Sequence, residues 1–233
     1  MRRFPSLSLL LATALLLGGC TNYVKSSQPW FTADDARQAP AVRSGWWVIA
    51  DADCRFSAEA PSAAWPECVE PFLLPPGDRL LLRKASPDGS IDGEYLLVSG
   101  EPLIVQVFAR GDGKAEPPTA DEYGYYGLKP RRHDSQGRIT AFDVWPALCG
   151  PPRPITNEHP FDDRTRRPWP GLDIGNEATG CTARDVETLR GAVRRSKRFG
   201  YGGQAPAFRW IRDWRPGDQT QEEWLAALAD QSH

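Results

Sequence analysis

The chain lacks the motifs by which common enzyme classes are found. Its 233 residues contain no Gly-x-Ser-x-Gly turn, no His-Glu-x-x-His motif and no phosphate-binding glycine loop. Positive charge is not in excess either, since the formal net charge is −2, and this argues against a general nucleic-acid-binding protein. We therefore expect no nucleic-acid partner, no metal, no cofactor and no catalytic residue that a motif would identify.

Hydrophobic runs long enough to cross a membrane are also missing. The apolar run from Leu7 to Leu17 has 11 residues, whereas a membrane-spanning helix needs about 20. It follows a positively charged start at Arg2 and Arg3, and it ends in Leu17-Gly18-Gly19-Cys20. A short basic start, a short apolar run and small residues at the end are typical of a signal peptide.

The end of this run resembles the lipobox of bacterial lipoproteins. Leu17, Gly19 and Cys20 match it, and Gly18 is small where Ala or Ser is more usual. The resemblance, which covers residues 1–20 only, implies that signal peptidase II removes residues 1–19 and that Cys20 receives a diacylglycerol thioether and an amino-terminal acyl chain such as palmitate. Two or three acyl chains give stable anchoring. Thr21 in place of Asp then favours the outer membrane of a Gram-negative cell, and the alternative is an ordinary secretory signal.

The mature chain is predicted to consist of a tether and one domain. Residues 20–42 are polar without a sustained period, so we expect a lipidated flexible tether, in which Trp30 and Phe31 are able to dock back. Residues 43–233 would form a single domain. Removal of residues 1–19 takes away two arginines, so the mature formal charge is −2 − 2 = −4.

The domain is predicted to be an α+β fold, an antiparallel sheet of five or six short strands with two C-terminal helices and many loops. One helix would run from an N-cap at Thr182 to Phe199, and another would begin at Thr220. Single strands are expected at 44–54, 78–84 and 207–214. Two further strands are expected within 95–108, on the two sides of a turn, and both should be buried at the centre of the sheet. A hairpin is expected within 125–145.

Four cysteines remain for disulfide bonds once Cys20 is set aside. In an oxidising envelope they allow three connectivities, of which the local pairing Cys54–Cys68 and Cys149–Cys181 is favoured. A zinc site is the alternative, but no pair has the Cys-x-x-Cys spacing that such sites normally use.

The proline-rich segment between Cys149 and Cys181 is the best candidate binding surface, since long loops inside a compact domain are usually functional or disordered. Arg164, Arg166, Arg167 and Trp169 would form a cationic–aromatic patch for an anionic glycan or a lipid phosphate. A second basic surface is predicted on the helix after Thr182. It would consist of Arg190, Arg194, Arg195, Lys197 and Arg198 on one face.

Two functional classes follow from these observations. The favoured one is a lipid-anchored envelope protein facing the periplasm, a non-catalytic binding, structural or accessory module whose partners are the bilayer and envelope proteins or an anionic glycan. The alternative is an envelope hydrolase acting on peptidoglycan or another glycan, with His159, Asp162 and Asp163 as acid–base groups. The tryptophans are expected in the core, with a sugar-stacking platform as the other interpretation.

Overall fold

The structure is a computed structural model in which nine stretches of the chain are described. They comprise residues 22–50, 54–61, 64–66, 68–74, 93–109, 122–152, 167–174, 180–199 and 207–215. Among these residues no helix combines the length and the apolar character needed to cross a membrane. The predicted strand at 78–84 and the predicted helix from Thr220 lie outside the described residues.

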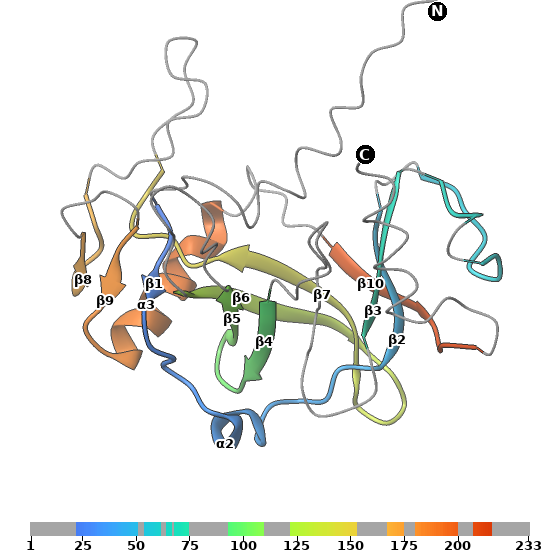
Figure 1. Ribbon diagram of the computed structural model, residues 1–233, viewed down its shortest axis with the longest axis horizontal. Coiled ribbons are helices and arrows are strands. Elements are labelled where there is room, and N and C mark those ends of the chain that lie inside the picture. Colours follow the sequence, from blue (N-terminus) through green and yellow to red (C-terminus); the bar gives the residue numbers. More distant parts are fainter. Residues whose placement is uncertain are drawn as a thin grey trace, which may run out of the picture.

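An antiparallel sheet of eight strands dominates the fold, and it is strongly curled (Figure 1). Seven strands follow the order β3-β2-β10-β7-β6-β5-β4, while β1 pairs with β6 beyond the end of β7. A separate two-stranded sheet consists of β8 and β9. The elements are β1 Lys25–Ser26, α2 Ala33–Ala36, β2 Gly45–Ala50, β3 Val69–Leu74, β4 Gly93–Val98, β5 Leu103–Ala109, β6 Glu122–His133, β7 Ile139–Pro146, β8 Leu172–Asp173, β9 Thr182–Ala183, α3 Val186–Ser196 and β10 Ala207–Arg212.

The predicted α+β class is wrong, because the fold is mainly β. The sheet has eight strands rather than five or six, and α3 is the one helix longer than a single turn among the described residues. The strand expected at 207–214 is confirmed as β10, but its place in the sheet was not predicted. After α3, β10 returns to the middle of the sheet, where it pairs with β2 and β7.

Local turn signals predicted both hairpins correctly. β4 and β5 pair on both sides of the turn at 99–102, and β6 and β7 pair on both sides of Asp134–Gly137. In the second turn the Asp134 carboxylate accepts hydrogen bonds from the backbone N–H groups of Gln136 and Arg138 at 2.9 and 3.0 Å, while Gly137 has a φ of 76°. The β4–β5 pair was expected at the centre of the sheet, but β4 is the last strand in the order.

Side chains cover both faces of the sheet and form two cores. Along β5, Ile104 faces the core under α3, and its neighbours Leu103 and Val105 face the other core. This alternation is the expected period of a strand, and burial on both sides explains why the sequence is nearly continuously apolar.

Helix α3 covers one face of the sheet and begins later than predicted. Its N-cap is Asp185, whose carboxylate accepts a 2.7 Å hydrogen bond from the Thr188 backbone N–H, whereas Thr182 belongs to β9. Val186 packs partly buried against the core, and Leu189 and Val193 are fully buried, as their helical spacing predicted. The α-helix ends at Ser196, and residues 197–199 form a 3₁₀ turn.

The described part of the expected tether, residues 22–42, lies against the domain instead of standing free. Val24 and Phe31 are buried, at 0% and 5% exposure. The Gln106 side chain of β5 accepts hydrogen bonds from the backbone N–H groups of Trp30 and Phe31 and donates one to the Phe31 carbonyl, each at 3.0 Å. Because the segment is mostly polar, the sequence predicted a flexible tether and not a segment packed on the domain. Docking of Trp30 and Phe31 was the one contact expected.

Candidate functional site

The first described residues are held between two other parts of the chain. We call residues 22–25, 147–150 and 181 the N-terminal junction. On one side, the Cys149 N–H donates to the Asn22 carbonyl at 2.6 Å and the Val24 N–H donates to the Ala147 carbonyl at 2.8 Å. On the other side, the Cys181 N–H donates to the Tyr23 carbonyl at 3.1 Å. The amino-terminal segment is therefore hydrogen-bonded along both edges.

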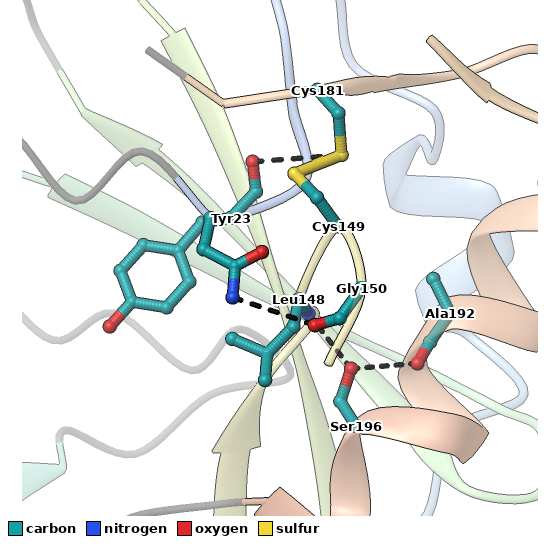
Figure 2. The surroundings of a disulfide bond; sticks show 8 residues. Tyr23, Leu148, Cys149, Gly150, Cys181, Ala192 and Ser196 are labelled. Carbon is teal, nitrogen blue, oxygen red and sulfur yellow. Dashed lines mark hydrogen bonds between the residues drawn. A yellow bond between two sulfur atoms is a disulfide. The ribbon is translucent and has the colours of Figure 1, made fainter. Parts of the chain in front are cut away.

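A disulfide bond joins the two edges of the junction. Cys149 and Cys181 lie on opposite sides of the segment and are bonded to each other beside the Tyr23 carbonyl (Figure 2). Their exposures are 0% and 3%, so the bridge is inside the protein. The predicted pairing of these cysteines is confirmed, and the bridge fixes both neighbours of the amino-terminal segment.

The other predicted disulfide is confirmed as well. Cys54 and Cys68 are bonded with a Cα–Cα distance of 5.8 Å. Beside it, the Trp65 ring packs edge-on against Trp46 at a centroid distance of 5.9 Å. The described contacts of the segment it closes are with Trp46 of β2, Arg212 of β10 and Arg215, none of which belongs to the N-terminal junction.

The C-terminal end of α3 is fixed to the N-terminal junction by one buried hydroxyl. Ser196 is 0% exposed; its Oγ accepts a 2.8 Å hydrogen bond from the Leu148 N–H and donates a 2.7 Å one to the Ala192 carbonyl (Figure 2). One turn earlier, the Trp145 indole donates a 2.9 Å hydrogen bond to the Val193 carbonyl. The last turn of the helix thus lies directly beside residues 145–148.

Four exposed cations flank that buried serine in the sequence, and we call them the basic helix end. Arg194 pairs with Glu187 at 2.7 Å, and the Lys197 ammonium lies 5.7 Å from the centroid of the Trp145 ring. Among the described residues, no carboxylate forms an ion pair with Lys197 or with the two remaining arginines. The four residues of the basic helix end are Arg194, Arg195, Lys197 and Arg198.

The predicted basic face is therefore shorter than expected. Arg190 belongs to a different environment, because its guanidinium donates a 3.0 Å hydrogen bond to the Ser99 carbonyl and lies 5.7 Å from the Phe31 ring centroid. It links α3 to the turn between β4 and β5. This contact was not predictable from helical periodicity, because it joins residues that are 91 positions apart in the sequence.

The predicted cationic–aromatic patch is described only in part. Arg167 is exposed and has an interaction partner. Trp169 is 8% exposed and belongs to the core beside Cys149, whose carbonyl accepts a 2.9 Å hydrogen bond from the Trp169 N–H. A role of this ring in gripping a ligand is therefore not supported. Arg164, Arg166, His159, Asp162 and Asp163 lie outside the described residues, as does Cys20.

Seven of the eight described tryptophans are buried or partly buried, as the core interpretation predicted. Trp46, Trp47 and Trp145 are at most 1% exposed. Trp47 packs 5.1 Å from Phe142, which stacks on Phe208 at 4.9 Å. Trp214 is the exception, at 46% exposure.

The shifted pKa values in the described part have structural causes. Hydrogen bonds from Thr188 hold the pKa of the Asp185 carboxyl below its usual range, and burial raises the pKa of Tyr125. Within the described ranges, no three metal-ligating side chains lie together. Of these two groups, Asp185 caps a helix and Tyr125 belongs to the core.

The features that gather at one place are accordingly the amino-terminal segment, the Cys149–Cys181 bridge and the basic helix end. Comparison with known proteins adds no further assignment: no protein-family model, no curated protein and no solved structure matches this chain.

Proposed function

We propose that this chain is a bacterial envelope lipoprotein, anchored through a lipid on Cys20 and acting as a non-catalytic binding or accessory module in the periplasm. The observation that carries the proposal is the use of the cysteines. Four of the five are paired in two disulfide bonds, and the remaining one is the cysteine that follows Leu17-Gly18-Gly19. A lipid on Cys20 accounts for the odd cysteine without a free thiol.

The compartment follows from the same chemistry. Disulfide bonds persist in oxidising compartments such as the bacterial periplasm and are rare in the cytosol. A signal peptide that ends at a lipidated cysteine delivers the chain to that compartment and leaves it attached to a membrane. Because Thr rather than Asp follows Cys20, we assign the anchor to the outer membrane.

A single substitution tests the proposal. The Cys20→Ser chain is expected to lose lipid and to accumulate as an uncleaved precursor, whereas the unchanged chain fractionates with the outer membrane as a processed form. An inhibitor of signal peptidase II should stop the processing of the unchanged chain. Processing of Cys20→Ser to the same mature length would contradict lipidation.

A further inference from the structure

We propose that the basic helix end docks the domain on anionic phospholipid headgroups beside the anchor, so that the domain lies on the membrane. The inference rests on the proposed lipidation of Cys20. It goes further by naming the surface that faces the bilayer and the lipid class it contacts.

The first argument is the length of chain between the anchor and the domain. Asn22 is 2% exposed, its carbonyl accepts the Cys149 N–H, and its side-chain amide donates to the Gly150 carbonyl. Two residues of fully extended chain reach about 7 Å. A lipid on Cys20 is therefore held close to Asn22, and a flexible tether of about 20 residues, which would allow a distance of roughly 25 Å, is not present between them.

The second argument is what lies beside Asn22. Leu148 forms a bridge with Tyr23, and its N–H donates to Ser196 in the middle of the basic helix end. Arg195 and Lys197 are the sequence neighbours of Ser196, and both are exposed. The cations therefore lie on the helix turn that is hydrogen-bonded to the strand partner of Tyr23, close to where the anchor would emerge.

The third argument is charge complementarity. The mature chain has a formal charge of −4, since the −2 of the full chain loses Arg2 and Arg3, and most orientations of the domain would be repelled by an anionic surface. The basic helix end presents four cations within five residues, and one acidic partner, Glu187, is present for Arg194. Clusters of at least four Lys or Arg beside a membrane anchor bind anionic lipid.

The surface can be tested without the lipid on Cys20. The chain from residue 20 with Cys20→Ser is mixed, at low ionic strength, with vesicles of phosphatidylcholine alone or of phosphatidylcholine and phosphatidylglycerol in equal parts, and its partition coefficient is measured by sedimentation. We expect binding to the anionic vesicles only. Substitution of Arg195, Lys197 and Arg198 by Gln should reduce it about 100-fold, since each cation near the surface contributes about fivefold.

A matched control removes the same charge elsewhere. Lys129, Arg132 and Arg209 are exposed on β6 and β10, and their replacement by Gln should leave the partition coefficient unchanged. An equal loss in both triple variants would overturn the assignment of the surface. Binding to lipopolysaccharide micelles but not to phosphatidylglycerol would overturn the assignment of the lipid. Neither result bears on whether Cys20 is lipidated.

The lipidated protein provides an internal comparison. Lys197 and Lys129 are both exposed, and the whole chain contains only five lysines. With the lipoprotein reconstituted in anionic vesicles, amine-reactive labelling followed by mass spectrometry should show slower labelling of Lys197 than in neutral vesicles, and unchanged labelling of Lys129. Equal labelling of Lys197 in the two kinds of vesicle would contradict docking.

Discussion

The backbone N–H of Cys149 donates a 2.6 Å hydrogen bond to the carbonyl of Asn22. This bond holds the start of the described chain against Cys149. The disulfide partner of Cys149 is Cys181, whose N–H donates to the Tyr23 carbonyl on the opposite edge of the segment. Whatever precedes Asn22 is consequently attached to a fixed point of the fold.

Removing the Cys149–Cys181 bridge should destabilise the protein and loosen the N-terminal junction. The double variant with Ala at both positions loses about 3 to 4 kcal/mol of unfolding free energy in the loop-entropy model. Hydrogen exchange at Val24 and Lys25 should become faster, because both edges of the segment are released. Denaturant unfolding and exchange measured by mass spectrometry check the two effects.

The Cys54–Cys68 bridge is the control for that experiment. Its removal should lower stability by about 3 kcal/mol but leave exchange at Val24 unchanged under native conditions, since the segment it closes contacts β2 and β10 rather than the junction. Equal acceleration at Val24 in both variants would mean that the junction does not depend on its own disulfide.

Gly127 should tolerate no side chain. It lies opposite Trp145 in the β6–β7 pairing, and a Cβ at residue 127 would overlap the Trp145 indole, which is also hydrogen-bonded to Val193 of α3. Gly127→Ala should therefore cost about 1 to 3 kcal/mol. At Gly124 of the same strand the nearest atom would be 3.8 Å away, so thermal unfolding of Gly124→Ala should match that of the unchanged protein. A neutral Gly127→Ala would show that this contact relaxes freely.

Ser196→Ala should separate the end of α3 from the junction. The substitution leaves the buried Leu148 N–H without its 2.8 Å acceptor, and an unsatisfied buried donor costs about 1 to 3 kcal/mol. The exposed Ser135→Ala is the comparison and should change the free energy of unfolding by less than about 0.5 kcal/mol. Indistinguishable urea midpoints for the two variants would refute the role assigned to Ser196.

The N-cap of α3 should make stability depend on pH in the acid range. Because the pKa of Asp185 is lowered in the folded state, the ionised carboxylate contributes stability above the unfolded-state pKa, and this contribution disappears as the pH falls through the lower, folded-state pKa. Asp185→Asn keeps a capping acceptor but removes the ionisation. The stability difference between the two proteins should shrink on acidification, and a constant difference would show that the charge contributes nothing.

Elements with local signals were predictable from the sequence, and elements that depend on distant residues were not. The turn at Asp134–Gly137 and the short-range disulfides are encoded within a few tens of residues. Strand β3 was missed because Pro71 interrupts it, yet the proline is tolerated at the end of the strand order, where β3 pairs with β2. The return of β10 between β2 and β7 depends on pairings more than 60 residues apart, which no local pattern contains.

The same distinction applies to the candidate site. Helical periodicity correctly predicted that Leu189 and Val193 face the core, but it grouped Arg190 with the cations at the end of the helix, and the structure places Arg190 beside Ser99. The hydrogen bond between Ser196 and Leu148 spans 48 residues of sequence. The hydrogen bond between Arg190 and Ser99 spans 91 residues. The first of these contacts brings the basic helix end to the N-terminal junction, and the second takes Arg190 away from it.

The mass of the amino-terminal peptide of the membrane-extracted protein tests the central claim most directly. The account predicts a peptide that begins at Cys20 and carries a diacylglycerol group and an additional acyl chain. A mature chain that begins at another residue, or an unmodified thiol at Cys20, would contradict it.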